Sequence, residues 1–145
     1  MEKLENYIPL EKLEVVCNSI QEAHGLPNEC YLEGGYTKFE RKILFEDKWV
    51  VIGVASNLKQ KGEAVPFNLL GIPLIILKDK NDKIRVFHNV CSHRGYKLLN
   101  EPCKIKNALR CPYHSWAYDL NGKLVSTPHI GGMDKNDADG FVKSR

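Results

Sequence analysis

The 145-residue sequence lacks several features that mark other classes of protein. No apolar run approaches the roughly 18 residues that a membrane-spanning helix requires. The first thirty residues include Glu2, Glu5, Glu11 and Glu14, which spoil the basic-then-apolar pattern of a signal peptide. There is no block of lysine or arginine typical of a nucleic-acid surface, and the net charge is only +3. We therefore expect a cytoplasmic protein with no membrane and no nucleic-acid partner.

The cysteine count also excludes a complete disulfide framework. Five cysteines cannot all pair within one chain, and thiols stay reduced in the cytoplasm, where cysteine clusters more often bind metal. The length suits one domain with one modest core. A hydrophobic content of 43% and a charged content of 27% are ordinary for a globular protein. Metal binding is therefore the first function to consider for the cysteines.

Hydrophobic spacing predicts helices first and strands afterwards. Apolar residues recur at helical spacing over 10–23, with Cys17 on the apolar stripe and so expected in the core, and a second helix is predicted over 38–49. Short β-branched or aromatic runs between turn residues then predict strands over 50–55, 64–70, 74–78, 84–88, 116–120 and 123–125. Asn121-Gly122 is the pair favoured for a type I′ hairpin, because both positions need positive φ.

These patterns divide the chain into three parts. Residues 1–48 are a helical lead, residues 49–130 a β domain, and residues 131–145 a tail with little periodicity. Strands at this spacing without intervening helices favour an antiparallel sandwich or barrel. The predicted fold class is therefore mainly β, with an N-terminal helical segment before it.

Two short arms in the β domain carry metal-binding side chains. The first is Cys91-Ser92-His93 and the second is Cys111-Pro112-Tyr113-His114. Thiolates and imidazoles suit zinc, copper and iron–sulfur centres. Structural zinc sites usually group their cysteines and their histidines separately, whereas a Rieske centre has two cysteines on one iron and two histidines on the other. The mixed order favours a Rieske-type [2Fe–2S] cluster bound by Cys91, His93, Cys111 and His114, and a structural zinc module is the alternative.

The sequence around these arms resembles the Rieske family. About two thirds of the chain resembles the N-terminal part of Rieske-type non-haem iron oxygenase large subunits, the ring-hydroxylating and choline- or carnitine-oxidising group. The residues that carry the resemblance are the run from Phe87 to Gly95, the run from Arg110 to Asp119, Tyr36-Thr37, the run from Phe45 to Trp49 with Gly53, and Gly122-Lys123-Leu124. Ser115 is a departure, because the family generally has glycine there, but it removes no ligand.

The resemblance also implies a branch of the family. In the respiratory branch, two further cysteines bridge the loops and a serine bonds a cluster sulfide, and the matching residues here are Tyr96, Tyr113 and Trp116. The reduction potential is therefore expected near the low end of the Rieske range of roughly −150 to +300 mV. Tyr118 either donates a hydrogen bond to a cysteine sulfur or is an ordinary packed aromatic. Cys103 fits neither ligand pattern and is expected to be a small buried thiol.

The resemblance implies electron transfer as part of an oxygenase large subunit, of the ring-hydroxylating or quaternary-amine monooxygenase or dioxygenase type. Such an enzyme also needs an iron site of two histidines and a carboxylate. The three remaining histidines, His24, His88 and His129, lack that spacing, so mononuclear Fe(II) is expected only in an absent catalytic domain, and the chain alone is not catalytically complete. The expected partners are a ferredoxin or flavin/NAD(P)H reductase as electron donor, and further copies in a homotrimer. A stand-alone Rieske ferredoxin is the alternative.

Overall fold

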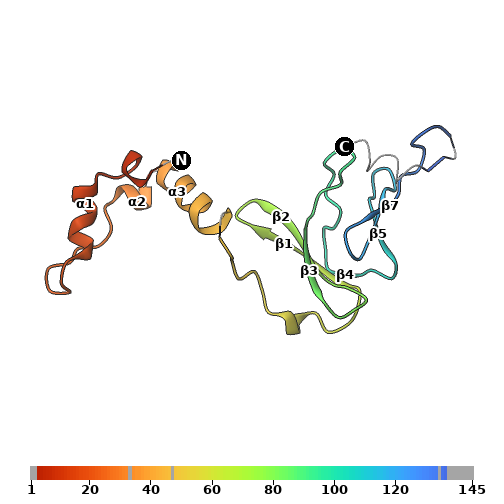
Figure 1. The fold of residues 1–145 in the computed structure, drawn as a ribbon, viewed down its shortest axis with the longest axis horizontal. Coiled ribbons are helices and arrows are strands. Elements are labelled where there is room, and N and C mark those ends of the chain that lie inside the picture. Colours follow the sequence, from red (N-terminus) through yellow and green to blue (C-terminus); the bar gives the residue numbers. More distant parts are fainter. Residues whose placement is uncertain (1–2, 33, 47, 134, 137–145) are drawn as a thin grey trace. The chain divides into compact units, whose positions relative to one another are not determined.

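The structure is a computed structural model that describes residues 3–32, 34–46, 48–133 and 135–136. The chain divides into two units, residues 1–51 and residues 52–145. In the described part of the chain, the α-helices belong to the first unit and the strands to the second (Figure 1). The fold is mainly antiparallel β with short helices at the N-terminus, which confirms the predicted class. Most of the tail predicted over 131–145 lies outside the described residues.

The first unit consists of short helices and turns. Its elements are η1 (Leu4–Asn6), α1 (Leu10–Glu14), η2 (Val15–Cys17), α2 (Glu29–Leu32), α3 (Gly34–Arg41) and the π-helical turn η3 (Lys42–Glu46). The helix predicted over 10–23 was wrong beyond Cys17, because Asn18 takes extended backbone with ψ 174°. The helix predicted over 38–49 begins earlier, at Gly34, and its π-helical end is Glu46.

The apolar stripe of the first predicted helix is poorly covered. Leu10 is 50% exposed and Ile20 is 90% exposed. Cys17, expected in the core, is also exposed, which corrects that prediction. Because a short helix depends on packing of its apolar face for stability, a stripe without cover does not sustain four turns. Among the described residues of this unit, Ile8 is fully buried, and the rings of Tyr7 and Phe39 lie 5.1 Å apart.

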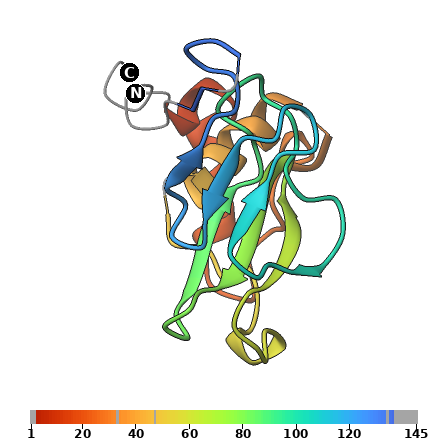
Figure 2. The ribbon, with the colours of Figure 1, turned by 90° about the vertical axis from the view of Figure 1, so that its right-hand side faces the viewer.

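The second unit contains two antiparallel sheets (Figure 2). The four-stranded sheet has the order β3-β2-β1-β4 and consists of β1 (Glu63–Leu69), β2 (Ile72–Lys78), β3 (Ile84–His88) and β4 (Cys103–Lys104). The three-stranded sheet has the order β5-β6-β7 and consists of β5 (Ala108–Arg110), β6 (Ala117–Asp119) and β7 (Leu124–Ser126). Five of the six predicted strands are present within a few residues of their predicted bounds. The short strands β4 and β5 were not predicted.

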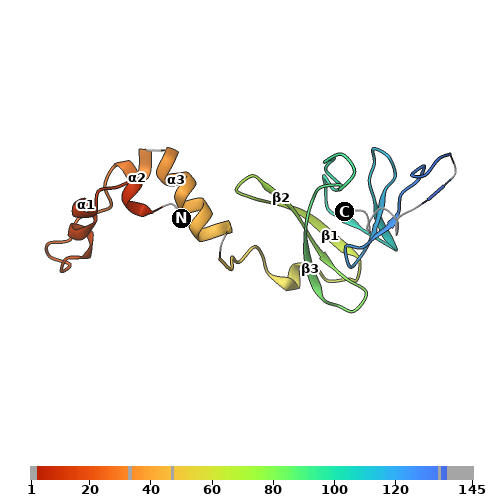
Figure 3. The same ribbon diagram turned by 45° about the horizontal axis from the view of Figure 1, so that its top comes forward.

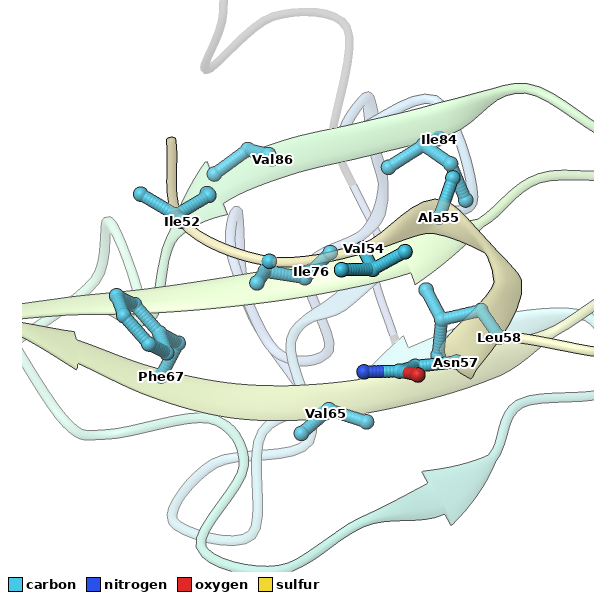
Figure 4. A pocket seen from close by; sticks show the side chains of 11 residues that line it. Ile52, Val54, Ala55, Asn57, Leu58, Val65, Phe67, Ile76, Ile84 and Val86 are labelled. Atoms are coloured by element: carbon cyan, nitrogen blue, oxygen red, sulfur yellow. The ribbon is translucent and has the colours of Figure 1, made fainter. Parts of the chain in front are cut away.

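The predicted strand over 50–55 was wrong. Residues 50–54 carry no regular structure, and the 3-10 turn η4 (Ala55–Asn57) follows. Ile52, Val54 and Leu58 lie instead over the face of the four-stranded sheet, opposite Val65 and Ile76 (Figure 4). The apolar side chains that resemble a strand pattern therefore face a sheet without pairing to it, and they line an apolar groove of about 370 Å³ with that sheet.

One apolar core joins the two sheets. Its buried side chains come from β1, from β2, from the chain between the sheets and from the residue after β6: Ala64, Ile75, Leu77, Leu99, Ile105 and Leu120. Leu109 of β5 is partly buried and packs against them. Gly62 allows a close approach beside this core, because its φ is +82° and a Cβ there would lie 2.1 Å from the Ile105 carbonyl oxygen. Its own carbonyl accepts a hydrogen bond from the Ile105 N–H. Only glycine fits this position without moving the backbone.

The two main hairpins use the same aspartate-based turn. In the β2–β3 turn, Asp79 Oδ1 accepts hydrogen bonds from the N–H groups of residues 81 and 83, and in the β6–β7 turn, Asp119 Oδ1 accepts them from residues 121 and 123. The fourth residue has positive φ in both, Asp82 at +63° and Gly122 at +84°. Asn121 has no positive φ, so the predicted type I′ turn was wrong. The pairing of β6 with β7 also contains a register shift, between Ala117 and Tyr118.

Arg85 stabilises the first of these turns. Its Nε donates to Asp79 Oδ2 at 2.8 Å, and Asp79 is 1% exposed. This hydrogen bond, with those from the N–H groups of Lys83 and Asn81, outweighs the cost of burial and holds the pKa of Asp79 below its ordinary value. The described helices include none with the length and apolar character needed to cross a membrane.

Candidate metal centre

The loop between β3 and β4 carries the predicted ligands Cys91 and His93 and is here called the first ligand loop. It follows the β3 strand that Figure 3 labels. The Cys91 N–H donates to the Tyr96 carbonyl at 2.8 Å, and the Gly95 N–H donates to the Cys91 carbonyl at 2.9 Å. Asn89 holds the base of the loop, because its Nδ2 donates to the Leu99 carbonyl at 2.6 Å and its Oδ1 accepts from the Leu99 N–H at 2.8 Å. Asn89 is fully buried. The two ends of the loop are thus fixed to each other by one side chain.

The second ligand loop joins β5 to β6 and repeats this geometry. The Cys111 N–H donates to the Trp116 carbonyl at 2.7 Å, and the Ser115 N–H donates to the Cys111 carbonyl at 3.0 Å. Ser115 has φ +59°, close to the +69° of Gly95 at the matching place in the first loop. A left-handed backbone explains why the family generally has glycine here, since a non-glycine residue costs about 1 kcal/mol in that conformation. The second loop nevertheless has the same two backbone hydrogen bonds as the first.

The structure brings the four predicted ligands together. Cys91 and Cys111 are 1% and 2% exposed and belong to one buried cluster with Trp116. The rings of His93 and His114 lie 4.8 Å apart, edge to face, at an angle of 72°. Each loop therefore supplies one buried thiol and one partly exposed imidazole to the same place.

The donor set fits a [2Fe–2S] cluster. Among the described residues, His114 Nδ1 is the one buried side-chain nitrogen or oxygen that has no hydrogen-bond partner. Buried polar atoms are rarely left in this state, and a ring nitrogen without a partner is available to bind iron. No three His, Cys, Asp or Glu side chains in the described parts gather around a single point. A [2Fe–2S] centre of the Rieske type needs only two protein ligands on each iron.

Aromatic side chains pack against both imidazoles. The Trp116 ring stacks on His93 with centroids 4.6 Å apart and 12° between planes, and Trp116 is 1% exposed. The Tyr113 ring lies 3.7 Å from His114, and Tyr96 lies 5.6 Å from Tyr113. Tyr96 and Tyr113 thus meet across the two loops, at the positions where the respiratory branch has its disulfide. Packing of this kind restricts the rotation of the ligand rings.

Tyr118 contacts the first loop from β6. Its hydroxyl lies 3.3 Å from Cys91 Sγ, within hydrogen-bond distance, and it accepts a hydrogen bond from the Ser92 N–H at 2.9 Å. Of the two alternatives expected for this residue, contact with a cysteine sulfur therefore fits better than an ordinary packed aromatic. Burial, followed by the hydrogen bond with Cys91, raises the pKa of Tyr118 above its usual value. The hydroxyl therefore keeps its proton at neutral pH and is available as a donor.

The other candidate residues lie outside this centre. Cys103 is exposed on β4, which corrects the prediction of a buried thiol. His88 is exposed at the end of β3, and His24 is exposed in the first unit. His129 and Arg94 are also exposed and line, together with His93 and His114, an open pocket of about 550 Å³.

Sequence reasoning did not find two of the residues that shape the centre. Asn89 was part of the resemblance but was given no role. An amide side chain that directly follows an apolar strand and lies two residues before a predicted ligand is expected to be buried and hydrogen-bonded, as Asn89 is. Trp116 was placed at the start of a predicted strand and at the position of the respiratory serine, but not against a histidine. Its stacking on His93 depends on a distance that no sequence pattern specifies.

Comparison with known proteins agrees with the geometry. The family model for the Rieske [2Fe-2S] domain matches residues 48–136. The carnitine monooxygenase oxygenase subunit of Acinetobacter baumannii is 31% identical over 133 residues, which are 89% of this chain and 36% of that protein. Biphenyl dioxygenase subunit alpha of Metapseudomonas furukawaii is 31% identical over 127 residues, which are 86% of this chain and 28% of that protein.

Solved structures show the same fold. The apo form of the quaternary ammonium Rieske monooxygenase CntA superimposes with a TM-score of 0.71 at 28% identity, over 80% of this chain and 34% of that one. A quaternary ammonium Rieske monooxygenase described with inter-subunit electron transfer gives 0.68 at 30% identity, over 77% and 32%. This chain spans about a third of the length of the curated relatives it matches, in their N-terminal part. It belongs to the Rieske [2Fe–2S] family, and its relatives are Rieske oxygenase large subunits.

Proposed function

We propose that Cys91 and Cys111 bind one iron of a [2Fe–2S] cluster and that His93 and His114 bind the other. The observation that carries this assignment is the convergence of two buried thiols and two imidazoles, one of which has a buried nitrogen without a partner. The cluster supplies a site that accepts and releases one electron at a time. The part of the chain from 49 to 130 would be the electron-transfer domain, residues 1–48 its helical lead, and residues 131–145 the connection towards a catalytic domain.

The protein residues have separate tasks in this function. Cys91 and Cys111 exclude water from one side of the centre, because both are buried with Trp116. His93 and His114 are only partly buried, so electrons enter and leave through the imidazole edge. Hydrogen bonds to the cluster sulfurs raise the reduction potential. Trp116 has no hydroxyl to donate such a bond, whereas the respiratory branch has a serine at this position. The potential is therefore expected in the lower part of the roughly −150 to +300 mV Rieske range.

The whole protein is proposed to be an oxygenase large subunit of the quaternary-amine or ring-hydroxylating type. The carnitine monooxygenase and biphenyl dioxygenase relatives support this class. A ferredoxin or flavin/NAD(P)H reductase in the cytoplasm would supply the electrons, and the cluster would serve a mononuclear iron in a catalytic domain. The relative described with inter-subunit electron transfer supports a homotrimer in which that iron belongs to a neighbouring copy.

The cluster assignment is tested by anaerobic purification, metal analysis and EPR spectroscopy after reduction with dithionite. We expect about two irons and two sulfides per chain and the EPR signal of a reduced Rieske centre. A colourless, EPR-silent sample that contains one zinc per chain would instead establish the structural zinc module.

A second measurement separates an oxygenase subunit from a stand-alone Rieske ferredoxin. The oxygenase assignment expects the native polypeptide to be about three times as long as this chain, in line with the 36% coverage of its carnitine monooxygenase relative. Mass spectrometry of the protein isolated from its own cells measures that length. A native mass of 16.5 kDa would favour the ferredoxin.

The charge around the loops predicts how the electron donor binds. Residues 89–100 and 108–118 contain Arg94, Lys97 and Arg110 and no aspartate or glutamate. Charges of one sign around a site accelerate association with a partner of opposite sign by about ten- to a thousandfold, and salt weakens the effect. We expect Arg94→Glu combined with Lys97→Glu to slow reduction by an acidic ferredoxin about tenfold at low salt, and the difference to shrink as salt is added.

Stopped-flow kinetics with a reduced acidic ferredoxin measures this rate. Lys80→Glu combined with Lys83→Glu is the matched control, because it changes the net charge equally and both lysines are exposed in the β2–β3 turn, at the opposite end of β3 from the ligand loop. Equal slowing by this control would mean that only the net charge of the chain matters, which would contradict docking at the loops.

A further inference from the structure

The Tyr118 hydroxyl meets three groups of the first ligand loop at once. Its oxygen lies 2.9 Å from the Ser92 backbone nitrogen, 2.9 Å from Ser92 Oγ and 3.3 Å from Cys91 Sγ. Tyr118 itself is on β6, in the middle of the three-stranded sheet. Two of the three contacts are with Ser92, which lies between the two proposed ligands of this loop. The proposed electron-transfer function assigns no role to Ser92.

Proton counting limits how these contacts are arranged. A tyrosine hydroxyl has one proton to donate and acceptor lone pairs, and a backbone N–H can only donate. The Ser92 N–H therefore occupies one lone pair of the Tyr118 oxygen. The Tyr118 proton is left with two acceptors within reach, Ser92 Oγ and Cys91 Sγ. A cysteine sulfur bound to iron is deprotonated and can only accept.

One arrangement satisfies all three contacts. The Ser92 hydroxyl donates to the second lone pair of the Tyr118 oxygen, and the Tyr118 proton then points to Cys91 Sγ. In the opposite arrangement Tyr118 donates to Ser92 Oγ, and the sulfur receives no hydrogen bond from it. The direction of the Ser92 hydroxyl thus decides whether Tyr118 donates to the ligand sulfur.

We propose that Ser92 is a positioning residue that donates its hydroxyl proton to Tyr118 and so directs the Tyr118 proton to Cys91 Sγ. This inference rests on the proposed function, because it takes Cys91 as an iron ligand. A hydrogen bond to a ligand sulfur stabilises the more negative, reduced cluster and raises its reduction potential. Ser92 therefore adjusts the potential through the Tyr118 hydroxyl.

The test is to measure the reduction potential of the anaerobically purified protein and of its Ser92 variants. Ser92→Ala is expected to lower the equilibrium constant for one-electron reduction about three- to tenfold, where tenfold corresponds to about 59 mV. Ser92→Thr keeps a hydroxyl and is expected to stay near the parent value. Ser56→Ala is the matched control, because Ser56 is exposed in η4 at a distance along the chain from both loops.

A double variant distinguishes positioning from a general effect of polarity. With Tyr118→Phe the proton to be directed is gone, so Ser92→Ala is expected to cause no further fall in that background. An unchanged or raised potential in Ser92→Ala, or an equal fall in the Tyr118→Phe background, would overturn the inference while the cluster assignment stands. A parent protein without a Rieske EPR signal would overturn the proposed function itself, and this inference with it.

Discussion

His114→Ala will lower the iron and sulfide content of the reconstituted protein at least tenfold. The buried Nδ1 of His114 has no partner among the described residues, so the side chain has no structural hydrogen bond at that atom to lose. In the proposed cluster, its removal would leave one iron with a single protein ligand and open the site to water. Even residues that only support metal ligands change affinity by about 10- to 100-fold, and a ligand itself is expected to matter at least as much. His93→Ala is expected to behave in the same way.

The other histidines provide matched controls for this experiment. His88→Ala and His24→Ala remove exposed imidazoles from the end of β3 and from the first unit, and both are expected to retain the parent content of iron and sulfide. Chemical analysis of iron and acid-labile sulfide, with the visible absorption spectrum, measures the outcome. Full cluster content in His114→Ala would contradict the assignment of this residue as a ligand.

The strands of the β domain were predictable where the pattern of side chains and the turns agree. β3 matches the predicted range 84–88 because its apolar residues alternate and the Asp79 turn precedes it. The range 50–55 is also rich in apolar residues and is not a strand, because its backbone enters no strand pairing in the described chain and Ile52 and Val54 face the sheet from above it. An apolar pattern alone does not specify pairing, which depends on which neighbour is within reach.

The candidate ligands of the centre could be proposed from the sequence for a different reason. The chemistry of thiolates and imidazoles limits which residues can bind iron, and their spacing in two arms is visible in the sequence. The groups that support them were less visible, because their roles depend on distances across the fold. The Tyr118 hydroxyl reaches Cys91 from a strand 27 positions later, and two alternatives for it remained open until the structure brought the atoms together.

Asn89→Ala is expected to lower the free energy of unfolding by about 3 kcal/mol and the melting temperature by about 10 °C or more. Asn89 is fully buried and pairs with both backbone groups of Leu99, which is itself 8% exposed. Alanine leaves that N–H and that carbonyl buried without these partners, at about 1–3 kcal/mol each. Because these bonds close the base of the Cys91 loop, the cluster is also expected to be lost faster in air.

Asn89→Asp tests the same contact through pH. Its carboxylate would accept from the Leu99 N–H but could not donate to the Leu99 carbonyl, and burial would raise its pKa above the ordinary value of about 3.9. A carboxyl whose pKa is raised on folding destabilises the folded state when it is ionised and ceases to do so when it is protonated. The loss of stability in Asn89→Asp should therefore shrink as the pH falls from 7 towards 5. Thermal denaturation followed by circular dichroism measures both variants, with the exposed Asn121→Ala as control. A deficit below about 1 kcal/mol for Asn89→Ala would show that Asn89 does not hold the loop, since a single ordinary hydrogen bond contributes about that much.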